Sequence, residues 1–99
     1  ATRVARQVVK DYTIAGTIEH AKEMIRLGKA LGEEADHLVP DYARALHRLS
    51  DATNVYQRAI TTYTAIDAAS HKAAIEFAED NLIAIRQDMK KYKKQGGIE

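Results

Sequence analysis

The sequence has no cysteine and no tryptophan, and it has one proline, Pro40, and one phenylalanine, Phe77. Without cysteine, neither a disulfide framework nor a thiolate metal site can form. No apolar run approaches the roughly 20 residues that a membrane-spanning helix needs. The first residues also lack the charged region, apolar stretch and small-residue cleavage site of an export signal. These absences lead us to expect a cytoplasmic protein.

Length and charge point to a single ordered unit. The 99 residues are enough for one domain with a modest core, so we expect one helical domain over residues 1–99. Hydrophobic residues make up 45% of the chain and charged residues 29%, as in ordered globular proteins. The net charge of +1 gives no global reason to expect a nucleic-acid partner.

Alanine dominates the apolar content. It is a small side chain and contributes little burial energy, because apolar burial stabilises by about 25 cal/mol per Å². Alanine also allows helices to approach closely. An alanine-rich face therefore predicts helices that lie close together with a thin core.

Apolar and small residues recur at alternating steps of three and four, which is the period of a helix face. The first series comprises Ile14, Ile18, Ala21, Ile25, Gly28, Gly32, Ala35, Val39, Tyr42, Leu46, Leu49, Thr53, Tyr56, Ile60 and Tyr63. The second series comprises Ile75, Ala78, Leu82, Ile85, Met89 and Tyr92. The second series is out of register with the first, which predicts a turn between Asp67 and Lys72, with Ser70 as the N-cap of the last helix.

The expected helices are 3–31, 40–66 and 71–94. We place a connection at 32–39, because glycine costs about 1 kcal/mol in a helix and Pro40 fits the first turn of a new one. The alternative is one long helix kinked at Pro40. The last helix should end near Lys94, with Gly96 and Gly97 as the stop. The predicted fold is all-α, an antiparallel helical bundle or long hairpin completed by oligomerisation or by a partner.

No residue pattern supports catalysis. Glu34 and His37 have the E-x-x-H spacing of carboxylate-bridged metal sites, but a second such pair is missing. His20 with its neighbouring glutamates, and Asp67 with His71, are typical of exposed helix faces. No nucleophile motif or glycine-rich phosphate loop accompanies them. We predict a protein that is not an enzyme, with no cofactor, no metal site and no small-molecule substrate.

The first apolar series predicts a partner interface. Gly28 and Gly32 form a G-x-x-x-G spacing that lets another backbone approach closely, and a face of tyrosine and alanine is typical of interfaces. The alternative is an ordinary intramolecular core with tyrosines at its edge. The candidate interface residues are Ile25, Gly28, Gly32, Tyr42, Leu46, Leu49, Tyr56, Ile60 and Tyr63. The predicted partner is a protein, either a second copy or another helical chain.

A basic run near the C-terminus predicts a second kind of partner, a nucleic acid or an anionic membrane surface. Its lysines can contact phosphates and its tyrosine can stack on a base. The alternative is that the lysines only stabilise the C-terminal end of the helix dipole. The candidate residues are Arg86, Lys90, Lys91, Tyr92, Lys93 and Lys94.

The order of long helices resembles the helical hairpins of small secreted partners of bacterial type VII systems, and parts of membrane-curving BAR modules. Tyr63 and Asp67 match the Y-x-x-x-D export spacing of the first family. The tryptophan-x-glycine turn of that family is absent, since the chain has no tryptophan, and BAR modules are longer. No function is transferred from either resemblance.

Overall fold

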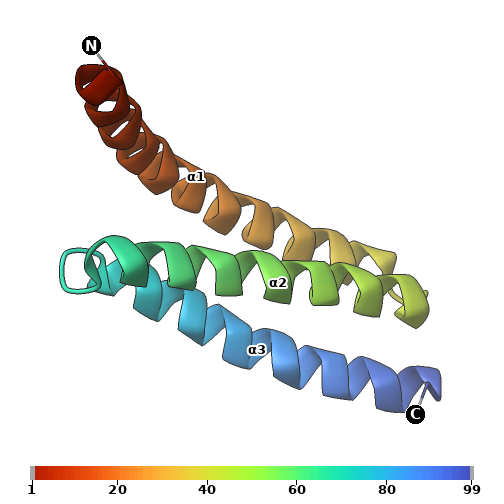
Figure 1. The fold of residues 1–99 in the computed structure, drawn as a ribbon. Helices are drawn as coiled ribbons and strands as arrows, with labels where there is room; N and C mark the ends of the chain where they lie inside the picture. The colour runs from red at the N-terminus through yellow and green to blue at the C-terminus, as the bar shows by residue number, and fades with distance from the viewer. Residues whose placement is uncertain (1, 99) are drawn as a thin grey trace.

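The computed structural model describes the backbone of residues 2–98 and the side chains of residues 18–98. Over this part the chain forms three helices, α1 (Thr2–Leu38), α2 (Tyr42–Asp67) and α3 (Lys72–Gly96), and no strand. Successive helices run in opposite directions, and α2 packs against both α1 and α3 (Figure 1). The predicted all-α fold of about three helices is confirmed.

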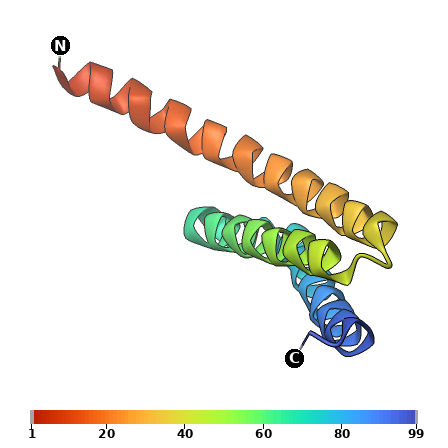
Figure 2. The ribbon, with the colours of Figure 1, turned by 90° about the vertical axis from the view of Figure 1, so that its right-hand side faces the viewer.

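The bundle is long and open. It measures 61 × 24 × 20 Å, and α1, at 37 residues, is much longer than α2, at 26. In Figure 2, α1 and α2 lie close together near their connection and diverge toward the N-terminus, while α3 crosses at an angle. Because α1 and α3 each pack mainly on α2, contact between α1 and α3 is local.

The first connection does not lie where the sequence predicted it. Residues 32–38 are helical, α1 ends at Leu38, and α2 begins at Tyr42 rather than at Pro40. The single kinked helix is also wrong, because the chain reverses direction over residues 39–41 (Figure 1). Gly28 and Gly32 do not end α1, because packing stabilises the helical turns that follow them. Ala35 is fully buried in the core, and Leu38 packs against that core. Pro40 lacks an N–H and disfavours helix at the residue before it, so the break comes there.

Asp41 begins α2 as its N-cap. Its carboxylate accepts a hydrogen bond from the backbone N–H of Arg44 at 3.3 Å, and its side chain also forms an ion pair with Arg44 at 3.5 Å. A carboxylate at this position satisfies a free N–H and interacts favourably with the helix dipole. The negative charge that the sequence supplies after Pro40 therefore fixes the start of α2.

The second turn lies where the register shift predicted it, over residues 68–71, but Ser70 is not the N-cap. His71 holds that position and makes no side-chain capping hydrogen bond. Ser70 instead donates its hydroxyl to Asp67 Oδ2 at 2.6 Å, and its backbone N–H donates to Asp67 Oδ1 at 3.3 Å. Asp67 therefore stabilises the turn from the end of α2, and Ser70 lies within this turn, one residue before the N-cap position.

Glycine ends α3, as predicted, but two residues later than Lys94. Gly97 adopts a left-handed conformation with φ of 63°, and its N–H bonds to the carbonyl of Lys94 at 3.4 Å. Ile98 closes the turn by donating its N–H to the carbonyl of Lys93 at 2.9 Å. Glycine adopts this conformation without the steric cost that a Cβ carries.

Small residues seven positions apart form the contact between α1 and α2. In α1 these are Ala21, Gly28 and Ala35, all buried. In α2 a small series, Ala45, Ala52 and Ala59, alternates with a large one, Leu49, Tyr56 and Tyr63, and all six are buried. A seven-residue repeat of this kind keeps one face of each helix toward its neighbour. The α2 face therefore contacts both neighbouring helices along its length.

Candidate functional site

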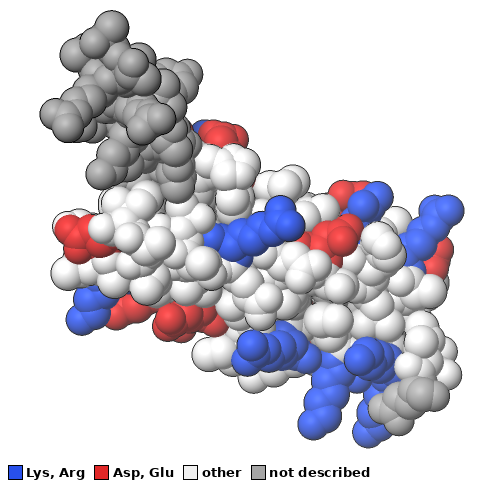
Figure 3. Space-filling view, in the orientation of Figure 1, with Lys and Arg blue, Asp and Glu red and all other residues white. Residues whose placement is uncertain are grey.

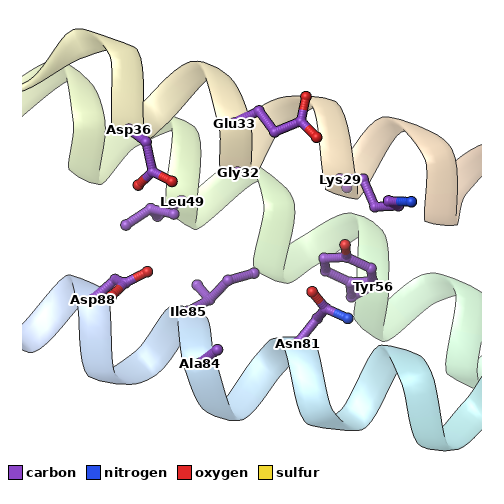
Figure 4. Close-up of a pocket in the computed structure, with 11 residues that line it drawn as sticks. Lys29, Gly32, Glu33, Asp36, Leu49, Tyr56, Asn81, Ala84, Ile85 and Asp88 are labelled. Carbon is purple, nitrogen blue, oxygen red and sulfur yellow. The ribbon is translucent and has the colours of Figure 1, made fainter.

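A hollow of about 220 Å³ lies between α1 and α3, with α2 as its floor (Figure 4). Leu49 and Tyr56 of α2 form the floor, and Ile85 of α3 contributes apolar surface. From α1 the lining residues are Gly28, Lys29, Gly32, Glu33 and Asp36, and from α3 they also include Asn81, Ala84 and Asp88. Small-molecule sites usually measure about 300–1,000 Å³, so this hollow is smaller than a typical ligand site.

The two glycines of the G-x-x-x-G spacing differ in what they contact. A Cβ at Gly28 would lie 2.7 Å from Cζ of Tyr56, so the absence of a side chain there is required by packing within the chain. A Cβ at Gly32 would meet nothing within 4 Å. Gly32 therefore carries the conformational cost of a helical glycine without an intramolecular contact that needs it.

Carboxylates from two helices flank the hollow. Asp36 of α1 and Asp88 of α3 extend toward one another across it, while Glu33 points away (Figure 4). Burial, together with the negative charge of Glu33, raises the pKa of Tyr56 above its ordinary value. At the other end, the ammonium of Lys29 lies 5.8 Å from the centre of the Phe77 ring. The hollow thus has a protonated phenol on its floor and acidic groups along one end.

Tyr92 joins α3 to α1 beside this hollow. Its hydroxyl donates to Asp36 Oδ1 at 2.9 Å, and its ring lies 5.6 Å from that of Tyr42. Burial is the main cause that raises the pKa of Tyr92 to about 12, and the hydrogen bond to Asp36 adds to it. Tyr92 is buried and engaged within the chain, so its ring is not available to stack on a nucleic-acid base.

The structure places the candidate interface residues at different depths. Four of them, Gly28, Leu49, Tyr56 and Tyr63, are buried between the helices of this chain. The half-buried ones are Ile25, Gly32, Tyr42, Leu46 and Ile60. Only Gly28, Gly32, Leu49 and Tyr56 meet at the hollow. Much of the predicted seam therefore packs within the chain.

The sequence reasoning missed part of the buried face of α2. Ala45, Ala52 and Ala59 are fully buried. The predicted apolar series instead contained the residue that follows each of them, namely Leu46, Thr53 and Ile60. Their exact seven-residue spacing was the available signal. Because α2 packs against two helices, its buried face is wider than a single seam.

The basic cluster lies along the C-terminal half of α3 (Figure 3). The side chains of Arg86, Lys90, Lys91, Lys93 and Lys94 are all exposed, and Tyr92 is buried behind them. Lys93 and Lys94 fall in the last turn of α3, where positive charge interacts favourably with the helix dipole. The structure therefore brings together five of the six predicted residues on the surface.

The acid and imidazole pairs contact other groups. Glu34 forms an ion pair with Arg48 of α2 at 3.0 Å rather than with His37. The hydrogen bonds from Ser70 lower the pKa of Asp67, and the His71 ring lies 4.8 Å from that of Tyr63. Among the residues with described side chains, no three His, Asp or Glu groups are placed to hold one metal ion.

Comparisons with known proteins found no matching family model, no matching curated protein and no matching solved structure. In the described part of the chain, none of the helices combines the length and the apolar character needed to cross a membrane.

Proposed function

We propose that this protein is a non-enzymatic helical interaction module that self-associates or completes a larger assembly. The observation that carries this proposal is Gly32, a helical glycine beside an open hollow, whose missing side chain serves no contact within the chain. A partner helix laid between α1 and α3 would use that space, since glycine allows two backbones to approach closely. The partner's side chains would enter the hollow above Leu49 and Tyr56, as in helix-in-groove recognition.

Filling the hollow tests this proposal. Gly32→Leu should block the partner helix while leaving the fold intact, because the new side chain meets no atom of this chain near its Cβ. Ala30→Leu is the matched control, because it adds the same side chain at an exposed position of the same helix. Neither substitution should lower the melting temperature, and removal of the helical glycine should raise it, so weaker association of Gly32→Leu could not come from unfolding.

Association is measured in two ways. Light scattering at micromolar concentration detects self-association, and capture from the native source followed by mass spectrometry detects another chain. We expect wild type and Ala30→Leu to associate and Gly32→Leu to be impaired. The proposal would be contradicted if wild type were a compact monomer in light scattering and if wild type and Gly32→Leu captured the same proteins.

A second candidate function is binding of polyanions or anionic membranes, favoured by the five exposed basic side chains in the C-terminal half of α3. Such binding weakens steeply as salt rises, because bound counterions are released. Replacing Lys90, Lys91, Lys93 and Lys94 with glutamine should abolish retention on heparin or on vesicles containing phosphatidylserine. Unchanged retention would exclude this function.

A further inference from the structure

The outward face of α3 carries acidic residues between 76 and 80 and basic residues between 86 and 94, and one further basic residue, Lys72, precedes the acidic ones. Acidic and basic groups are both visible along the lower edge of the molecule in Figure 3. The residues lie at helical spacing and all are exposed. We call this set the outer stripe of α3: Glu76, Glu79, Asp80, Ile83, Arg86 and Lys90.

Ile83 lies at the point where the charge changes sign. It is 54% exposed, the largest fraction among the exposed large apolar side chains of the described residues. A single exposed apolar residue is ordinary on a protein surface. Its position is informative here because the charges on its two sides are complementary to each other.

Most of these charges have no ion-pair partner within the described part of the chain. Glu76 approaches Lys72 at 4.0 Å, whereas Glu79, Asp80, Arg86 and Lys90 form no ion pair there. On α1, by contrast, Lys22 pairs with Glu19 and Arg26 with Glu23 one turn away. The outer stripe separates its charges rather than interleaving them, which leaves both the acidic and the basic residues free to pair with another chain.

We infer that the outer stripe of α3 binds the same stripe of a second copy of this chain, antiparallel and around a two-fold axis at Ile83; this rests on the proposed interaction function. Around that axis Ile83 faces its own counterpart, Asp80 faces Arg86 and Glu76 faces Lys90. Two-fold symmetry makes each of these pairs occur twice. A parallel arrangement would instead place acid against acid and base against base, so the charge pattern selects the antiparallel one.

The complementary part of the stripe is short. From residue 76 to residue 90 a helix rises about 21 Å, and a helix is about 10 Å wide. This contact is far smaller than the roughly 1,200 Å² that stable complexes bury, so the dimer is weak and reversible. Beyond it, Lys72 would face Lys94, but Lys72 already lies close to Glu76 of its own helix. Complementarity therefore ends at residues 76 and 90.

Two charge variants test this interface directly. Arg86→Glu with Lys90→Glu makes every charge of the stripe acidic, and Glu76→Lys with Asp80→Lys makes the charges that face Arg86 and Lys90 basic and leaves Glu79 as the one acidic residue. Each variant alone should dimerise at least about tenfold more weakly than wild type, because like charges then face each other. An equimolar mixture of the two should restore the dimer as a heterodimer. Sedimentation equilibrium from micromolar to millimolar concentration at low salt measures all four samples.

The control is Lys91→Glu with Lys93→Glu. It changes the net charge as much as the acidic variant does, but these residues point about 80° to either side of Ile83 on the helix. This control should keep the dimer, whereas a polyanion-binding site would be weakened by either pair of substitutions. Dimerisation lost equally in the control and the acidic variant would overturn the inference.

A cysteine at the proposed axis provides an independent readout, since the chain has no cysteine of its own. Ile83→Cys should oxidise to a disulfide-linked dimer faster than Arg58→Cys, which places a thiol on the exposed face of α2. Equal rates would overturn the two-fold arrangement. If wild type and both stripe variants associated equally well, this interface would be excluded. The proposed function would still stand, because Gly32→Leu tests the hollow separately.

Discussion

Gly28 and Gly32 lie one helical turn apart in α1, and the same substitution to alanine should change the stability of the protein in opposite directions. Alanine is favoured over glycine in a helix interior by about 1 kcal/mol. At Gly32 this gain is not opposed, because a Cβ there meets nothing within 4 Å. Gly32→Ala should therefore raise the free energy of unfolding by up to about 1 kcal/mol.

At Gly28 the same gain is opposed by Tyr56. A new Cβ would lie 2.7, 2.8 and 3.0 Å from three atoms of the Tyr56 ring, all shorter than ordinary contact distances. The ring is 1% exposed and packs in the core, so it has to shift to make room for the new Cβ. Overpacking of this kind costs about 1–3 kcal/mol. The helix-propensity gain is common to both variants and cancels in the comparison, so Gly28→Ala should be less stable than Gly32→Ala by about 1–3 kcal/mol.

Urea unfolding followed by circular dichroism measures both variants against wild type. For a domain of this size, a difference of 1 kcal/mol also corresponds to roughly 4–8 °C in melting temperature. Tyr56→Phe combined with Gly28→Ala serves as a control, since it keeps the ring and should not relieve the clash. If Gly28→Ala and Gly32→Ala were equally stable, the close approach of Tyr56 to α1 would be refuted.

Three further predictions concern single contacts. Tyr92→Phe removes the hydrogen bond to Asp36 and should lower the free energy of unfolding by about 1 kcal/mol. The pKa of Tyr92 is raised from 10.0 to about 12, so the stabilisation that Tyr92 provides is complete below pH 10 and is lost as pH rises toward 12. Urea unfolding should therefore show the difference in free energy of unfolding between wild type and Tyr92→Phe becoming smaller over that range. Ser70→Ala should raise the lowered pKa of Asp67, and the pH dependence of the carboxyl chemical shift measures this change. In wild type, the stabilisation that Asp67 provides is present above the usual pKa of aspartate and is lost as pH falls through the lowered pKa. Gly97→Ala should destabilise α3 by about 1–2 kcal/mol, because its φ of 63° is left-handed, and a melting temperature equal to that of wild type would contradict this.

The positions of the helices were largely predictable because their signals are local. The three-to-four period identified the helices, and the register shift between the two apolar series located the second turn. The end of α3 followed from two glycines after a basic turn. Each of these signals depends on residues within a few positions of each other, so no knowledge of distant contacts was needed.

The first connection was not predictable from local signals, because two opposing contributions are similar in size. Gly28 and Gly32 each disfavour helix by about 1 kcal/mol, which suggested a break. Packing of Gly28 against Tyr56 and burial of Ala35 favour its continuation, and both depend on the position of α2. Likewise, Ser70 was wrongly predicted as the N-cap, because α3 begins one residue later, after His71, and Ser70 bonds to Asp67 within the turn.

The sequence by itself determined that this protein is made of helices and that their faces are lined with small residues. It also determined that acidic residues at 76–80 and basic residues at 86–94 lie on either side of Ile83, since these properties follow from the order of neighbouring residues. Only the tertiary structure decided which glycine is required by packing and which faces open space, and that Tyr92 lies buried against Asp36 rather than at the surface. The physical reason is that burial and close contact depend on residues that lie far apart in the chain, and their energies equal or exceed the local preferences that a sequence displays.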